Sequence, residues 1–366
     1  MLHLFNQTDP YPDNLPSNVS RPRYFSDSVY YHAASLLGLA VESHRVGYST
    51  RNVIRTLGLS LNALRRMAGV DDRFAVVWQG YGVYAALANS IVSGKMPFIL
   101  NTYKVPNTGS QTFKTRINDR LLGSAATAAA GVVVISKSQC CALMQYNPHV
   151  LWLPFAADSN WWTPALPDHA FLTAQGVAYR DYVLVMGDVY RDEETTLRAV
   201  SDLKRPILRV TRSPQTAAAA REAFRALGIT CGDILVNVSF ELLREIYRGA
   251  RVVLVPARNN VYPAGMTSMT EAMSCGRPVV LPAGLTTEGY VKVGHDAFVL
   301  DTWEESAIRD QVTSAYDSEI GEVVGRNARN TVEERLNFRT SGAKLAGFIA
   351  ELGLAGESMG KIEVGA

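Results

Sequence analysis

The stretch from Val252 to Leu281 reads VVLVPARNNVYPAGMTSMTEAMSCGRPVVL, and it predicts a strand, a glycine turn, a helix and a second strand in immediate succession. Its first four residues form a short, β-branched apolar run that ends at Pro256, which is typical of a buried parallel strand. The second strand begins at Pro278, directly after Cys275 and Gly276 end the helix. Because strands that alternate with helices build parallel sheets, we expect an α/β fold.

The turn in this stretch has the residues of an anion site. Gly265 allows the backbone to approach a ligand closely, and we expect Thr267 or Ser268 to cap the helix. Free amides at a helix start, with the positive end of the helix dipole, favour a phosphate or a diphosphate. Glu271 follows about one turn later, where its carboxylate can accept hydrogen bonds from ribose or sugar hydroxyls. Glycine turns are also common connections in doubly wound domains. Gly265 alone therefore leaves two interpretations open, an anion site or an ordinary turn of the fold.

Two segments of this stretch resemble a known family. Residues 271–280, EAMSCGRPVV, are similar to the EAMA-x-G-x-PVV signature of retaining glycosyltransferases with the GT-B fold, family four in particular. Residues 264–273, AGMTSMTEAM, further resemble the AGQTTLLEAM form of a divergent bacterial branch. The resemblance implies two Rossmann-like, doubly wound domains facing a cleft, with a C-terminal helix that crosses back to the first domain.

The length of the chain and its other segments agree with two domains. A chain of 366 residues exceeds the usual size of a single core. Further strands are expected at 2–5, 74–78, 97–100, 131–135, 181–186, 207–211 and 234–239, and helices at 27–39, 83–92, 114–130, 241–250 and 337–352. The segment 150–164 resembles the family's interdomain connection. We expect an N-terminal acceptor-side domain at 1–165, a nucleotide-sugar-binding domain at 166–340, and a returning helix with the tail at 341–366.

Composition excludes some classes of protein. A formal net charge of +2 gives no bias toward nucleic acid, and the four cysteines show no metal-type spacing. No apolar run is long enough to span a bilayer, so we expect a cytoplasmic protein. One cluster of basic residues has two interpretations, a solvated helix face, which we favour, or a peripheral membrane contact. This cluster comprises Arg45, Arg51, Arg55, Arg65 and Arg66.

The resemblance assigns a second loop to the nucleotide diphosphate. Gly187 and Arg191 follow the strand at 181–186 and match a phosphate-facing loop of the family. Asp188 stands where the family often has an arginine, and Glu193 or Glu194 stands near its usual lysine. Arg212 is an alternative source of positive charge, and local ion pairing is the alternative for Arg191. Val238 either lines the base pocket or packs in the core.

The resemblance also implies how the donor is held. Family members carry Glu-x7-Glu, and Glu271 matches the second glutamate, which contacts the ribose, whereas Pro263 occupies the place of the first. The residues expected to bind the donor are Gly187, Arg212, Val238, Tyr262, Gly265, Met266, Thr267, Ser268 and Glu271. The chain has no Asp-x-Asp pair of hard oxygen ligands, so neither a metal nor another cofactor is expected.

The acceptor-side residues are expected in the N-terminal half of the chain. The residues expected there are Gln79, Tyr81 and His32, although a packed or solvated role is favoured for His32. Lys104 follows another strand and is expected to contact a phosphate or an acceptor acid. With Arg191 and Glu271, it completes the expected catalytic set.

The resemblance, together with these residues, implies a metal-independent, retaining glycosyltransferase of the hexosyltransferase type. It would move a sugar from a UDP- or GDP-linked donor to a hydroxyl of a glycan, a lipid-linked or a small-molecule acceptor, in bacterial glycan or glycoconjugate biosynthesis. Two other classes stay open: a GT-B nucleotide-sugar epimerase using Glu288 and His295 as titratable groups, and a non-catalytic GT-B-like nucleotide-binding protein. Monomer and homodimer both remain open.

Overall fold

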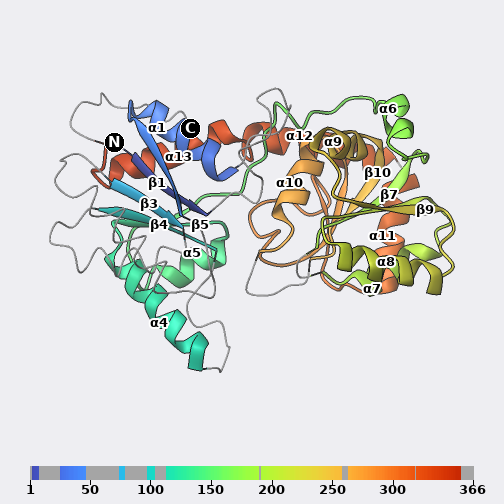
Figure 1. Ribbon diagram of the computed structural model, residues 1–366, viewed down its shortest axis with the longest axis horizontal. Helices are drawn as coiled ribbons and strands as arrows, with labels where there is room; N and C mark the ends of the chain where they lie inside the picture. The colour runs from blue at the N-terminus through green and yellow to red at the C-terminus, as the bar shows by residue number, and fades with distance from the viewer. Residues whose placement is uncertain are drawn as a thin grey trace. The chain divides into compact units, whose positions relative to one another are not determined.

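The computed structural model divides into two compact units (Figure 1). It describes residues 2–7, 25–46, 74–78, 97–103, 113–188, 191–257, 263–317 and 319–355. Unit 1 comprises Met1–Ser17, Ser26–Pro154 and Ser341–Ala366, and unit 2 comprises Asn18–Phe25 and Phe155–Thr340. The expected domain limits at 165 and 340 stay predictions.

Unit 1 contains a parallel sheet in the order β2-β1-β3-β4-β5-β6. Its strands are β1 (Leu2–Gln7), β2 (Val41–Val46), β3 (Phe74–Trp78), β4 (Phe98–Thr102), β5 (Gly131–Val134) and β6 (Val150–Trp152). Its described helices are α1 (Phe25–Leu36), α4 (Phe113–Ala128), α5 (Lys137–Leu143) and most of α13 (Phe338–Glu351).

Helices cover both faces of this sheet (Figure 1). Val132 and Val134 of β5 point into a core shared with α4 and α5. The alternate residue Gly131 faces Phe348 of α13, which approaches so closely that a Cβ on the glycine would lie 2.7 Å from the ring. The C-terminal helix therefore packs on the sheet of the N-terminal unit, as the predicted fold requires.

The strand β2 is a correction to the sequence analysis. Arg45 lies on this strand and not on a helix face, because Asn6 of β1 pairs with it in parallel register. As an edge strand it carries polar residues, VESHRV, and lacks the apolar run of the central strands. The other four arginines of that cluster and the expected helix at 83–92 lie outside the described residues.

Unit 2 contains a second parallel sheet, in the order β12-β11-β10-β7-β8-β9. Its strands are β7 (Tyr182–Met186), β8 (Ile207–Thr211), β9 (Gly232–Val236), β10 (Ala250–Leu254), β11 (Val279–Pro282) and β12 (Phe298–Leu300). Its helices include α6 (His169–Ala174), α7 (Glu193–Ser201), α8 (Pro214–Ala226), α9 (Phe240–Gly249), α10 (Met266–Ser274), α11 (Glu305–Asp317) and α12 (Glu319–Glu334).

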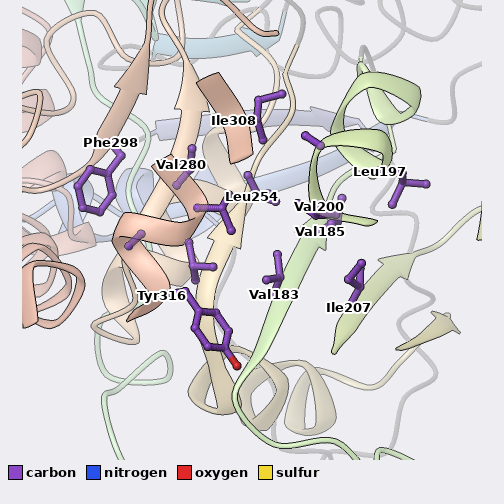
Figure 2. Close-up of a cluster of buried hydrophobic side chains, with 14 of the residues drawn as sticks. Val183, Val185, Leu197, Val200, Ile207, Leu254, Val280, Phe298, Ile308 and Tyr316 are labelled. Carbon is purple, nitrogen blue, oxygen red and sulfur yellow. The ribbon is translucent and has the colours of Figure 1, made fainter. Parts of the chain in front are cut away.

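The core of unit 2 lies between its sheet and helices that include α7, α8 and α11. Figure 2 shows the side chains that the sheet, α7 and α11 contribute to it. Val183 and Val185 of β7 point into this core, whereas Leu184 faces the other side, and all three are fully buried. Each such side chain stabilises the fold by about 1.5–3 kcal/mol relative to exposure. A strand buried on both faces fits the continuous apolar sequence YVLVM.

Most expected elements are confirmed, with bounds shifted by a few residues. The strands expected at 207–211 and 74–78 match β8 and β3, and the helix expected at 241–250 matches α9. In the part of the chain that the structure describes, no helix combines the length and apolar character needed to cross a bilayer.

Candidate functional site

The order of strands in unit 2 marks one place for a ligand. From β7 the chain continues to β8 and β9 on one side, and β10 then lies on the other side of β7. Crevices in open parallel sheets form outside the carboxyl ends of the strands where the order reverses in this way. The loops that leave β7 after Met186 and β10 after Leu254 flank this point. The expected residues Gly187, Arg191 and Gly265 lie on these two loops.

The two loops are tied to each other. The Asp192 amide donates to the Pro256 carbonyl at 2.9 Å, and Arg191 forms an antiparallel bridge with Ala257. Nε of Arg191 donates to the Met186 carbonyl at 3.3 Å. Glu194, one of the acids beside Arg191 in the sequence, pairs with Arg198 at 3.0 Å.

The Arg191 guanidinium occupies space that two glycines leave open. A Cβ on Gly187 would lie 2.2 Å from its Nη2, and a Cβ on Gly265 would lie 3.4 Å from the same atom. Both glycines have positive φ, +100° and +93°, a region in which other residues are strained. Gly187 and Arg191 of one loop and Gly265 of the other therefore come together at the switch point.

The start of α10 differs from the prediction. Gly265 is the N-cap, because its left-handed conformation lets its carbonyl accept from the Met269 amide at 2.9 Å. Thr267 and Ser268 lie in the first turn and do not cap it. A Ser or Asp side chain at the N-cap position caps each of α5 to α9, whereas Gly265 offers no such side chain to α10. The first-turn amides of α10 therefore receive no hydrogen bond from an N-cap side chain, which is the arrangement that favours an anion.

Glu271 projects from α10 toward Tyr247 of α9. The Tyr247 hydroxyl donates to Oε2 of Glu271 at 3.0 Å and also interacts with the Ser268 side chain. Burial raises the pKa of Glu271 to about 8, and the hydrogen bond from Tyr247 and the positive charge of Arg212 oppose this shift. At neutral pH the unliganded carboxyl therefore retains its proton for most of the time.

Tyr247 is itself fixed by packing. The Trp162 ring contacts it edge to face, with ring centroids 5.6 Å apart. The Trp162 carbonyl accepts from Ser274 Oγ at 2.6 Å and from Arg329 Nη1 at 2.9 Å. The segment 150–164, which contains Trp162, therefore holds the C-terminal end of α10. Sequence reasoning missed Tyr247, although a buried tyrosine on an amphipathic helix needs a partner for its hydroxyl.

A buried arginine pairs with acids of the loop after β7. Arg209 lies within β8 with 1% of its side chain exposed. Its Nε donates to Glu193 at 2.7 Å and its Nη2 donates to the Gly187 carbonyl at 2.7 Å, while Nη2 lies 3.6 Å from the Asp188 carboxylate. The signal in the sequence was an arginine inside an apolar strand, because a buried charge needs partners.

The structure places the remaining expected residues as follows. Arg212 follows β8, and its amide donates to Asp188 Oδ2 at 3.0 Å. Val238 is partly buried between β9 and α9, and Pro263 is buried directly before α10. His32 lies on α1 against α13, where a Cβ on Gly342 would lie 2.6 Å from its Cδ2. The residues outside the described part are Gln79, Tyr81, Lys104 and Tyr262.

No group of three metal-binding side chains stands together in the described ranges. The expected absence of a metal stays a prediction.

Neither a family model nor a curated protein sequence matches this chain. Solved structures do match it. Sucrose-phosphate synthase (tll1590) from Thermosynechococcus elongatus is 15% identical with a TM-score of 0.75, covering 97% of this chain and 99% of that one. Anabaena Alr3699/HepE in complex with UDP is 16% identical with a TM-score of 0.71, covering 96% and 100%. A UDP-forming trehalose-phosphate synthase from Burkholderia xenovorans, in complex with glucose-6-phosphate, is 12% identical with a TM-score of 0.64, covering 90% and 82%.

These similarities define the fold. The chain is an α/β protein with two parallel sheets flanked by helices, and its architecture is that of the GT-B glycosyltransferases. The predicted fold class is confirmed.

Proposed function

We propose that the protein is a retaining, metal-independent glycosyltransferase that uses a nucleotide-diphosphate sugar. The observation that carries this proposal is the start of α10, where the N-cap Gly265 has no capping side chain and lies beside Arg191 at the switch point of unit 2. Glu271 lies on the same helix, about one turn after its start. One helix therefore offers amides for a diphosphate and a carboxyl for ribose hydroxyls.

The chemistry follows from these groups. In the transfer, the bond between the anomeric carbon and the diphosphate oxygen breaks, and a bond to the acceptor oxygen forms on the same face of the sugar. The acceptor proton passes to the departing diphosphate. Arg191 and the first-turn amides of α10 stabilise the negative charge that develops on this leaving group. Fixed dipoles and a guanidinium supply this charge stabilisation without a metal.

Nucleotide and acceptor are proposed from the neighbours. Solved structures of Anabaena Alr3699/HepE hold UDP or UDP-glucose, so UDP-sugars come first and GDP-sugars second. The acceptor is a hydroxyl of a glycan, of a lipid-linked sugar or of a small molecule. Lys104 is proposed to contact a phosphate or an acid on it, with Gln79, Tyr81 and His32 on the acceptor side.

A panel of nucleotides tests this function. We expect the wild type to show a thermal shift with one nucleoside diphosphate and slow hydrolysis of the matching nucleotide sugar. Glu271→Ala should weaken nucleotide binding by about tenfold to a hundredfold, because a hydrogen-bonding carboxyl is lost. Glu222→Ala is the matched control, since Glu222 is an exposed carboxylate of α8 paired with Arg225. A wild type that responds to no nucleotide or nucleotide sugar would refute the proposal.

A further inference from the structure

Arg209 contacts both ends of the loop that joins β7 to α7. It holds the Gly187 carbonyl at one end and Glu193 at the other, and it lies 3.6 Å from Asp188. With 1% of its side chain exposed, it is out of reach of a ligand in the crevice. Its role in the site is therefore indirect.

This loop carries an excess of negative charge where an anion is expected to bind. From Gly187 to Glu194 the sequence has four acids and a single base, Arg191. The Asp188 and Glu193 side chains are only 20% and 22% exposed, so water and salt screen their charges weakly. Without compensation, these carboxylates would repel a diphosphate.

We infer that Arg209 is a positioning residue that makes this loop able to accept a diphosphate, by offsetting one of the two negative charges of Asp188 and Glu193 and by fixing the peptide after Gly187. This inference rests on the proposed function, because it concerns the same nucleotide site.

The geometry supports both parts of this role. Arginine offers several donors in a planar fork, so a single side chain can hold a carbonyl and a carboxylate together. The hydrogen bond from Nη2 orients the Gly187 carbonyl toward β8. Arg191, whose guanidinium packs against Gly187, depends on this arrangement for its own place.

The test compares Arg209→Gln with Arg198→Gln. Both remove one positive charge from an ion pair with α7, but Arg198 and its partner Glu194 are 48% and 78% exposed. Binding of UDP and GDP is measured by titration calorimetry, and binding of uridine and guanosine by ligand-observed NMR. We expect Arg209→Gln to weaken the diphosphate that the wild type binds by at least about tenfold and to leave the nucleoside unchanged. Arg198→Gln should change neither by more than about twofold.

A third variant keeps the test informative if Arg209→Gln does not fold. Arg209→Gln combined with Asp188→Asn and Glu193→Gln has no charge left in this group, whereas the wild-type group carries one net negative charge. We expect the diphosphate affinity of this triple variant to be no more than about threefold below that of the wild type. Loss of diphosphate binding in this triple variant, with nucleoside binding intact, would overturn the inference. Equal loss of diphosphate and nucleoside in Arg209→Gln would also overturn it, by showing a purely structural role. A wild type that binds neither nucleotide would instead refute the proposed function.

Discussion

Replacing Gly265 by alanine is expected to abolish nucleotide binding and to lower the free energy of unfolding by about 1–3 kcal/mol. The backbone at this position has φ +93°, and the new Cβ would lie 2.6 Å from Cγ1 of the buried Val255. Either the turn or Val255, directly after β10, must shift, and the turn carries the first amides of α10. The same Cβ would also contact the Arg191 guanidinium at 3.4 Å.

A second glycine separates backbone strain from the loss of the site. Gly176 lies in the same unit with φ +85°, and a Cβ there meets nothing within 4 Å. Gly176→Ala should therefore destabilise by about 1 kcal/mol and leave nucleotide affinity unchanged. Chemical denaturation gives the stability of both variants, and calorimetric titration with UDP gives their affinity. Full nucleotide affinity in Gly265→Ala would rule out close approach of a ligand to this turn.

The sequence predicted the elements of unit 2 well because their periodicity is strong. The apolar run of β7 and the amphipathic spacing of α9 each allow one interpretation, and both elements were confirmed. The edge strand β2 was missed because its residues are mostly polar, and the start of α10 was misplaced because hydroxyl residues follow Gly265. Preference for serine and threonine as caps is a local rule, and the left-handed glycine overrides it.

Within the candidate site, the sequence identified residues but not their partners. Spacing within one helix places Glu271 near the helix start, yet its contact with Tyr247 joins two helices separated by a strand. The sequence also did not show how the negative charge of the loop after β7 is offset, because the positive charge comes from Arg209 on another strand, β8. Such contacts depend on tertiary packing, which hydrophobic periodicity does not encode.

Affinity for a nucleotide sugar is expected to rise with pH between about 6 and about 8 and then to level off. The unliganded Glu271 carboxyl has its pKa raised to about 8 by burial, whereas an ionised carboxylate is the better acceptor for ribose hydroxyls. Binding below this pKa therefore releases a proton, and affinity should change by about tenfold per pH unit. Glu271→Gln should show a flat profile over the same interval.

The raised pKa of Glu271 also makes the stability of the fold depend on pH. The free energy of unfolding is expected to fall as the pH rises, whereas the affinity for the nucleotide sugar rises. The folded state holds the Glu271 proton up to about pH 8, whereas the unfolded chain releases it near the ordinary value of 4.5. Between these values the folded state binds more protons, so the free energy of unfolding falls as the pH rises. Relative to Glu271→Gln, the unliganded wild type should lose stability across this interval.

Tyr247→Phe tests the cause of the pKa value. The hydroxyl donates to Glu271 at 3.0 Å and so stabilises the ionised form, which means that its removal should raise the pKa of Glu271 further. The pH at which affinity levels off should move upward in this variant.

Titrations with a UDP-sugar avoid the ionisation of a terminal phosphate, and a 2′,3′-dideoxy analogue lacks the hydroxyls that Glu271 is expected to bind. Two results would contradict the assignment of Glu271 to the ribose: a wild-type affinity that is independent of pH, or the same pH profile with the dideoxy analogue. Only a contact with the ribose links the proton of the Glu271 carboxyl to the two hydroxyls.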